Sequence, residues 1–204
     1  MNGIDTILFD LGNVLIKWDP RNLYSKLFGH DTHAMEFFLE HVCSAEWNRS
    51  LDAGRPFAEA IAELQGEHPG YADHIAAWRS RWTEMLGGPV DGSVELLREL
   101  RERGHRVCAL SNWSSETFPI ARNLFPFLDW FERIVISGEV GLAKPDPAIF
   151  DLTVRQCRLT PARTLFIDDL ERNVAAARGA GMQAVLFVDP DRLRDDLSRH
   201  GLLD

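Results

Sequence analysis

The 204-residue chain has few cysteines, no excess of positive charge and no long uninterrupted apolar run. Three cysteines (Cys43, Cys108 and Cys157) are too few and too scattered for a disulfide framework or a zinc site. A formal net charge of −9 disfavours binding to nucleic acid and to anionic membranes. No stretch approaches the roughly 18 apolar residues of a membrane helix, and the first residues lack a cationic signal region. We therefore expect a cytoplasmic protein without nucleic-acid or membrane partners.

Five short apolar runs are typical of buried strands, and they lie at residues 4–10, 106–111, 133–137, 164–168 and 183–188. Each is rich in Val, Ile, Leu or Phe rather than alternating with polar residues, as in sheets covered by helices on both faces. Helical patterns separate them. One follows Asp91 and ends near Gly104, and another begins at Pro147 with Asp146 as its N-cap. This alternation predicts an α/β fold with a parallel sheet.

One long interval, residues 20–88, contains helical signals and no convincing strand. Apolar residues recur at helical spacing in two stripes, which comprise Phe57, Ile61 and Leu64, and then Ile75, Trp78, Trp82 and Met85. We interpret Trp78 and Trp82 as packing residues. A helical block inserted after the first strand of an α/β core predicts a lid over the carboxyl end of that strand, where open sheets bind ligands.

Polar side chains follow the first two strands of this predicted core. Asp10 ends the first strand and could be a nucleophile or a metal ligand, although an Asp before Gly-Asn is often only a turn residue. Ser111 and Asn112 end the second strand, where a hydroxyl and an amide can donate to an anionic oxygen. Capping of the next helix is an equally good explanation of this second pair.

Charged residues mark two later segments. Lys144 lies in a loop stiffened by two prolines, from which it could neutralise an oxyanion near Asp10. Asp168 and Asp169 end the fourth strand, and two adjacent carboxylates after a buried strand repel each other unless a cation is bound. Mg²⁺ prefers such oxygen ligands.

These four segments, in this order, resemble the haloacid dehalogenase superfamily, and the Phe-Asp-Leu-Gly-Asn-Val opening resembles its branch of α-glucose-1-phosphate phosphatases. The resemblance implies a Rossmann-like core (residues 1–19 and 89–204) with a small helical cap (residues 20–88). It also implies a Mg²⁺-dependent phosphatase of small phosphorylated metabolites, such as sugar phosphates. In that scheme Asp10 is the nucleophile, and Lys144 stabilises the negative charge at the site. Ser111, Asn112 and Lys144 hold the phosphoryl group, and the implied metal ligands are Asp10, the Gly12 carbonyl, Asp169 and Asp168.

Gly12 departs from the family pattern, because most of these phosphatases carry an acid/base Asp two residues after the nucleophile. Asp19 could reach in as a substitute, although an Asp before Pro is commonly a turn former. The departure keeps two alternatives open, a 2-haloacid dehalogenase and a catalytically impaired protein that binds a phosphorylated ligand. Within the cap, Trp47, Arg49 and the segment 51–54 are candidates for facing the substrate.

Overall fold

A computed structural model describes residues 3–29 and 31–204 and contains a five-stranded parallel sheet in the order β5-β4-β1-β6-β7. Its strands are β1 (Thr6–Phe9), β4 (Arg106–Ser111), β5 (Arg133–Ile136), β6 (Thr164–Asp168) and β7 (Gln183–Leu186). All five predicted strands are present, so the α/β class is confirmed. β1 lies at the centre, between β4 and β6, and all three strands end at the same edge of the sheet.

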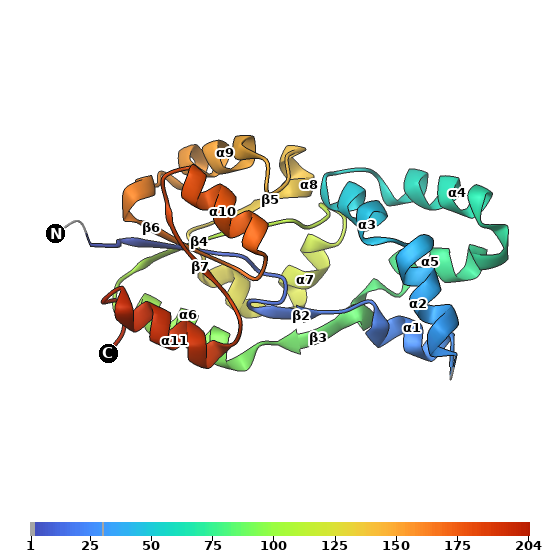
Figure 1. The fold of residues 1–204 in the computed structure, drawn as a ribbon, viewed down its shortest axis with the longest axis horizontal. Coiled ribbons are helices and arrows are strands. Elements are labelled where there is room, and N and C mark those ends of the chain that lie inside the picture. Colours follow the sequence, from blue (N-terminus) through green and yellow to red (C-terminus); the bar gives the residue numbers. More distant parts are fainter. Residues whose placement is uncertain (1–2, 30) are drawn as a thin grey trace.

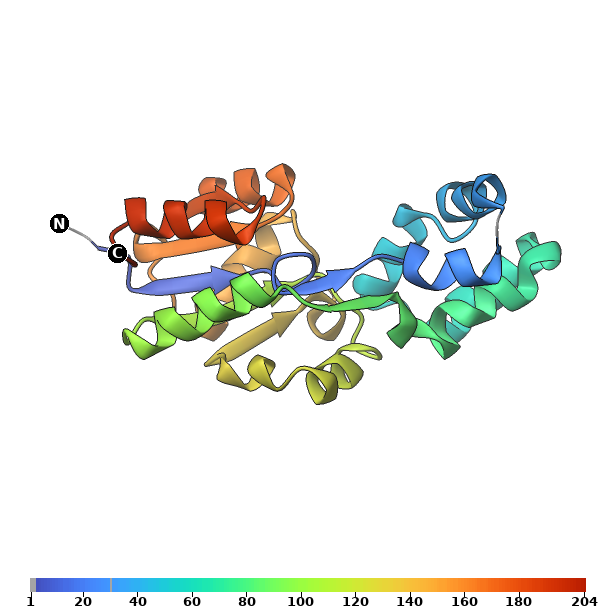
Figure 2. The same cartoon turned by 90° about the horizontal axis from the view of Figure 1, so that it is seen from below.

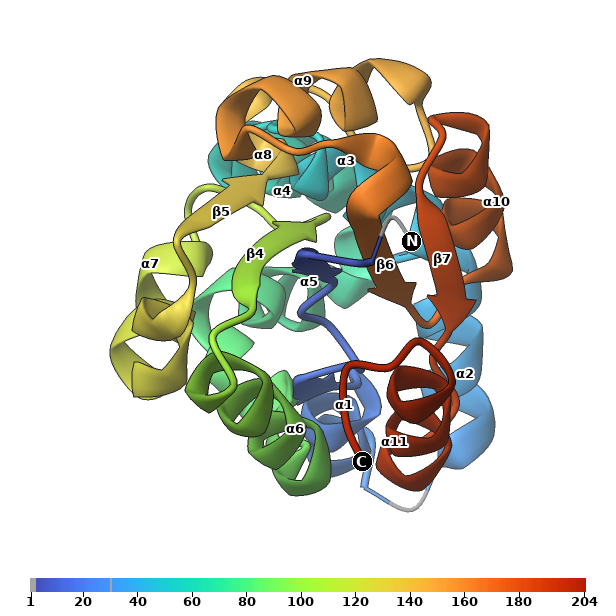
Figure 3. The same ribbon diagram turned by 90° about the vertical axis from the view of Figure 1, so that its left-hand side faces the viewer.

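Helices cover both faces of this sheet, as can be seen in Figure 3, where the view is roughly along the strands. The helices α9 (Pro147–Cys157) and α10 (Glu171–Gly179) lie over one face, and α6 (Asp91–Glu102), α7 (Phe118–Leu124) and α11 (Pro190–Arg199) over the other. Successive β1 residues point to opposite faces, so Leu8 packs in one apolar cluster, and Ile7 and Phe9 in the other. The remaining helices beside the sheet are α8 (Ser137–Val140) and two short 3₁₀ turns, Pro126–Trp130 and Pro161–Arg163.

A second group of helices, called the helical block here, extends from Arg21 to Met85 and lies beyond the carboxyl ends of the strands (Figure 1). It comprises α1 (Arg21–Leu27), α2 (Thr32–His41), α3 (Ala45–Asp52), α4 (Phe57–Glu67), α5 (Ala72–Ser80) and the 3₁₀ turns Pro69–Tyr71 and Trp82–Met85. Tyr24, Phe38 and Trp78 form its centre, with ring centroids of Tyr24 4.9 Å from Phe38 and 5.7 Å from Trp78. The predicted apolar stripe from Ile75 to Met85 is divided between two elements, because α5 ends at Ser80 and Trp82 and Met85 lie in the following 3₁₀ turn.

Two short strands that the sequence did not indicate join the helical block to the sheet (Figure 2). β2 (Ile16–Trp18) pairs antiparallel with β3 (Leu86–Pro89), and Trp18 lies opposite Leu86. The expectation of no strand within residues 20–88 is wrong at its end, since β3 begins at Leu86. Gly and Pro dominate β3 and are depleted in strands, so only the pairing with β2 makes this segment extended. No helix among the described residues is long and apolar enough to cross a membrane.

Candidate active site

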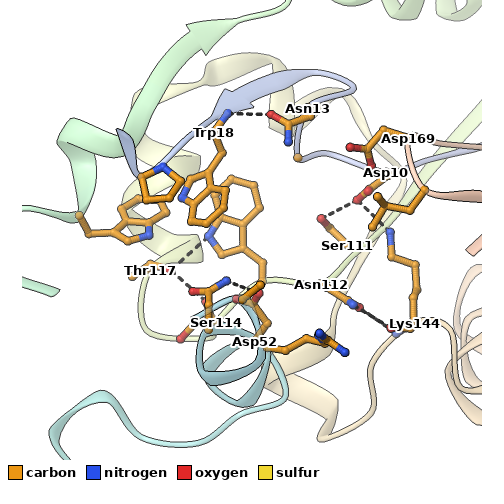
Figure 4. A pocket seen from close by; sticks show the side chains of 18 of the residues that line it. Asp10, Asn13, Trp18, Asp52, Ser111, Asn112, Ser114, Thr117, Lys144 and Asp169 are labelled. Carbon is orange, nitrogen blue, oxygen red and sulfur yellow. Dashed lines mark hydrogen bonds and ion pairs between the residues drawn. The ribbon is translucent and has the colours of Figure 1, made fainter. Parts of the chain in front are cut away.

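A cavity of about 480 Å³ lies where β1, β4 and β6 end, between the sheet and the helical block. Figure 4 shows its polar side chains, among them Asp10, Ser111, Asn112, Lys144 and Asp169. Crevices at this edge are where open parallel sheets bind ligands, because the loops that leave the strands surround the opening. These five predicted residues therefore come together in one cavity, although they are spread over about 160 positions of the chain.

Asp10 lies directly after β1 and is 6% exposed. Its N–H donates to the Ile167 carbonyl on the neighbouring strand at 2.8 Å, which holds the backbone at the sheet edge. Its Oδ1 accepts hydrogen bonds from the Ser111 hydroxyl and the Leu11 N–H, both at 2.7 Å, and lies 3.0 Å from Lys144 Nζ. No hydrogen bond from another described residue reaches Oδ2. One carboxylate oxygen is thus held in place while the other is available for chemistry.

Lys144 is a buried cation, with its side chain only 1% exposed. Its Nζ lies 2.6 Å from Asp168 Oδ2 as well as beside Asp10, so one ammonium group compensates two carboxylates. Burial alone would lower the pKa of Lys144, but the charges of Asp10 and Asp168 outweigh it and raise that pKa above its ordinary value. Lys144 therefore stays charged and is available to an anionic group in the cavity.

Asn112 holds the backbone of Lys144. Its Oδ1 accepts from the Lys144 N–H at 2.8 Å, and its Nδ2 donates to the Lys144 carbonyl at 2.9 Å. This pair of bonds fixes the loop that carries the lysine. An amide nitrogen has two hydrogens, so one N–H remains for a ligand. The predicted contact of Asn112 with a phosphoryl oxygen stays a prediction.

Asp10, Asp168 and Asp169 form the three-carboxylate group found among the described residues, with one oxygen from each within 4.8 Å of the others. Asp168 is fully buried and accepts from Lys144, from the Leu170 N–H at 2.9 Å and from Asn173 Nδ2 at 2.9 Å. Asp169 instead lines the cavity, as does Gly12. The arrangement fits a hard cation that contacts Asp10 and Asp169 directly, with Asp168 behind them.

The carboxyl groups of this cluster are electrostatically unfavourable on their own. Burial, with a contribution from the charge of Asp168, raises the pKa of Asp10 to about 7 even though Lys144 and Ser111 lower it. Burial and Asp168 also raise the pKa of Asp169. A bound divalent cation would reverse both effects by favouring the charged forms.

Asp19, the expected substitute for the acid missing at Gly12, lies outside the cavity. Its Oδ1 accepts from the Arg21 N–H at 2.9 Å, and its side chain is 47% exposed. It is therefore a turn residue at the start of α1. Of the other residues expected to face the substrate, Arg49 and Asp52 line the cavity, whereas Trp47 packs against Trp78 with ring centroids 5.3 Å apart.

An aromatic wall is the part of the site that the sequence did not reveal. It consists of Trp18, Phe57, Trp78, Trp82 and Trp113. Trp78 and Trp82 are buried packing residues, as expected, yet each also presents a surface to the cavity. Trp113 is fixed by its Nε1–H, which donates to Thr117 Oγ1 at 3.1 Å. The signal for Trp113 was its position directly after Ser111 and Asn112.

Comparison with known proteins places this geometry in a family. The family model of haloacid dehalogenase-like hydrolases matches residues 4–181. A D-ribitol-5-phosphate phosphatase from Bacteroides thetaiotaomicron is 31% identical over 187 residues, covering 88% of this chain and 90% of that protein. The sesquiterpene phosphatase astK of Aspergillus oryzae is 27% identical over 182 residues, covering 89% of each.

A solved structure shows the same fold. A HAD family enzyme from Bacteroides thetaiotaomicron, in complex with magnesium and inorganic phosphate, has a TM-score of 0.67 and 26% identity and covers 92% of this chain and 96% of that one. The family match spans β1, β4 and β6 and so includes every strand end that contributes to the cavity. The chain belongs to the haloacid dehalogenase-like hydrolases.

Proposed function

We propose that this protein is a Mg²⁺-dependent phosphatase that cleaves small phosphorylated metabolites through a phosphoryl group carried on Asp10. The observation that supports this most strongly is the asymmetry of the Asp10 carboxylate. Oδ1 is held by Ser111, Leu11 and Lys144, and Oδ2 is left for attack on phosphorus. In this proposal, residues 1–19 and 89–204 are the Rossmann-like core, and residues 20–88 are the cap that covers the site.

The metal ligands in this proposal are Asp10, Asp169 and the Gly12 carbonyl, with Asp168 as a further direct or water-mediated ligand. The three carboxylates fit Mg²⁺ because they are hard oxygen donors, and because burial and the charge of Asp168 raise the pKa of both Asp10 and Asp169 when no cation compensates them. When bound, Mg²⁺ would neutralise charge on the phosphoryl oxygens and so reduce their repulsion of the nucleophile.

The chain's own groups would orient the nucleophile and the phosphoryl group. Ser111 and Lys144 hold Asp10 in one rotamer, so little reorganisation is needed before attack. Lys144 and the free N–H of Asn112 would then donate to the phosphoryl oxygens, on which negative charge is concentrated. The single hydroxyl hydrogen of Ser111 would turn from Asp10 to donate to them as well. Asn112 also keeps Lys144 in place through its two backbone hydrogen bonds.

The substrate class that we propose is sugar phosphates and metabolites of similar size. Two observations support it. The cavity of about 480 Å³ suits a small molecule, and the relative with the highest identity reported above is named for a sugar-alcohol phosphate. The aromatic wall could pack against a sugar ring or against a more apolar substrate. The Aspergillus relative, for example, is named a sesquiterpene phosphatase.

A phosphate-release screen tests this proposal. We expect Mg²⁺-dependent release of phosphate from at least one class of small phosphomonoester, and loss of release when EDTA removes the metal. A parallel assay for chloride release from 2-chloropropionate covers the dehalogenase alternative. Metal-independent chloride release without phosphate release would contradict the proposed function. Thermal stabilisation by phosphorylated metabolites without any turnover would identify a binding protein instead.

A further inference from the structure

Asp52 is the carboxylate that the helical block contributes to the cavity wall among the described residues. The other residues from this block are apolar, amide or basic, and they include Leu39, Asn48, Arg49 and Phe57. Figure 4 shows Asp52 beside Ser114, across the cavity from Asp10 and Lys144. The site therefore has carboxylates on two opposite sides, one group at the strand ends and a single residue on the helical block.

The position of Asp52 is fixed by contacts with its own helix, with the loop that follows β4 and with α8. Asn48 Nδ2 donates to its carboxylate at 3.0 Å, and Ser114 lies beside it (Figure 4). The Ser137 hydroxyl donates to its backbone carbonyl. Two residues later Gly54, at φ +104, brings the chain so close that a Cβ there would lie 3.2 Å from the Gly138 carbonyl oxygen. Asp52 is thus docked against the sheet portion of the molecule.

This environment suits a group that exchanges protons near neutral pH. Burial, with a contribution from the charge of Asp10, raises the pKa of Asp52 to about 7, although Ser114 and the Asn48 hydrogen bond lower it. A side chain whose pKa is close to the working pH can both give and accept a proton. No described salt bridge includes Asp52, so no cation holds it in the charged form.

The other candidates for proton transfer are excluded by their positions. Gly12 has no side chain, and Asp19 lies outside the cavity. Asp168 is bound by Lys144 and Asn173, and Asp169 belongs to the metal group. Among the described residues that line the cavity, Asp52 is the one carboxylate that is neither the nucleophile nor part of the metal group.

We infer that Asp52 is the proton donor and acceptor of this phosphatase, an inference that rests on the proposed function. In the first step, Asp10 Oδ2 bonds to phosphorus as the bond from phosphorus to the alcohol oxygen breaks. The electron pair of the broken bond goes to that oxygen, and the proton of Asp52 joins it there. In the second step, water attacks phosphorus, its proton returns to Asp52, and the bond from phosphorus to Asp10 breaks to release inorganic phosphate.

Leaving-group dependence tests this role. We compare p-nitrophenyl phosphate, whose leaving group needs no acid, with 2-phenylethyl phosphate, which has similar bulk but a poor leaving group. Asp52→Asn should lower turnover of the alkyl ester by about 10²–10⁴-fold. First-turnover release of nitrophenolate should change less than about tenfold, and it should appear as a burst because the phosphoenzyme then hydrolyses slowly.

Asp19→Asn is the matched control, and it should keep turnover of both esters because Asp19 lies outside the cavity. The retained burst also shows that Asp52→Asn is folded. The inference is overturned if Asp52→Asn keeps full alkyl-ester turnover, if it loses both esters equally, or if wild type cleaves only the nitrophenyl ester. A wild-type protein that releases no phosphate from either ester or from any metabolite in the screen fails the proposed function itself.

Discussion

Lys144 compensates two buried carboxylates, but Asp169 shares the site without an ion pair among the described residues. Moving a charged group out of water costs several kcal/mol, and that cost is offset only by good partners. Asp168 has such partners in Lys144, Leu170 and Asn173. The carboxylate of Asp169 faces the cavity, so a cation bound there would be its main partner.

Asp169→Ala should therefore weaken Mg²⁺ binding more than Asp168→Ala does. We expect a loss of more than about 100-fold for Asp169→Ala and about tenfold for Asp168→Ala, as for residues that support a metal ligand from behind. Isothermal titration calorimetry measures both affinities, with the exposed helix residue Asp151 (changed to Ala) as the control that keeps wild-type affinity. Unchanged Mg²⁺ affinity in Asp169→Ala would exclude it as a ligand.

The sequence was most informative about residues at strand ends. Asp10, Ser111 and Asp169 could be placed together because parallel strands deliver their carboxyl ends to one edge. Lys144 lies in a loop after β5 and α8, so only the family resemblance placed it beside them. The two hydrogen bonds of Asn112 to Lys144 could not be predicted, because they depend on the path of a loop 32 residues away. Asp52 was one residue of the candidate segment 51–54. It could not be singled out from the sequence, because its position relative to Asp10 depends on how the helical block docks.

At the level of elements, α8 closely approaches the loop after β4, next to the segment of the helical block that carries Asp52 and Gly54. A Cβ at Gly138 would lie 2.6 Å from the Ser115 nitrogen and 2.8 Å from the Trp113 carbonyl oxygen. These atoms belong to the loop after β4 that carries Ser114, which lies beside Asp52 in the cavity wall (Figure 4). Helix α8, which follows β5 directly, therefore packs against the loop that lies beside the Asp52 carboxylate.

Gly138→Ala should consequently destabilise the protein by about 1–3 kcal/mol, because backbone atoms must move to make room for the methyl group. It should also lower phosphatase activity through the displaced Ser114. Gly66→Ala is the matched control. A Cβ there meets nothing within 4 Å in α4, and the change should stabilise the helix by about 0.5–1 kcal/mol. Urea unfolding measures both, and an equal effect of the two changes would contradict the close approach.

Element boundaries were predictable where local patterns decide them. The α9 start followed from Asp146, which caps the helix by accepting from the Ala148 N–H at 2.8 Å. The strands β2 and β3 were missed because each is extended only through the other. The apolar stripe from Ile75 to Met85 suggested one helix, but the chain turns at Arg81, whose φ of −122° is not helical.

At the scale of the whole molecule, a net charge of −9 adds to the repulsion within the carboxylate group. The fold class follows from the order of apolar runs, whereas the aromatic wall arises only when distant segments such as Trp18 and Trp113 meet. A site of this kind is expected to reduce the stability of the metal-free protein, because its carboxylates are arranged for binding rather than for the fold.

The pH dependence of metal-free stability should reveal this cost. Because the pKa of Asp10 is raised from 3.8 to about 7 in the folded state, folding favours the protonated form. The unfolded chain loses that proton first, so wild type should lose stability between about pH 4 and about pH 7, by a few kcal/mol at most. Asp10→Asn has no such ionisation. The melting temperature of wild type should therefore fall relative to that of Asp10→Asn as the pH rises over that range.

Mg²⁺ should raise the melting temperature of wild type more than that of Asp10→Asn, since the cation relieves repulsion that the amide lacks. Differential scanning calorimetry with and without Mg²⁺ gives all four values at each pH. Without Mg²⁺, the melting temperatures of wild type and Asp10→Asn could instead differ by a constant amount from about pH 4 to about pH 7. That result would show that Asp10 ionises as easily in the folded protein as in the unfolded chain.

Trapping the phosphoryl group on Asp10 tests directly whether this aspartate is the nucleophile. Wild type mixed with p-nitrophenyl phosphate and Mg²⁺ is quenched in acid within one turnover, reduced with borohydride and digested for mass spectrometry. We expect the wild-type peptide that contains Asp10 to carry the change that marks an acyl phosphate, and the same peptide of Asp10→Asn to be unmodified. The kcat of the Asp10→Asn enzyme should be at least about 10³-fold lower than that of wild type. Phosphate release without modification of Asp10, or modification of a different residue, would show that Asp10 is not the nucleophile.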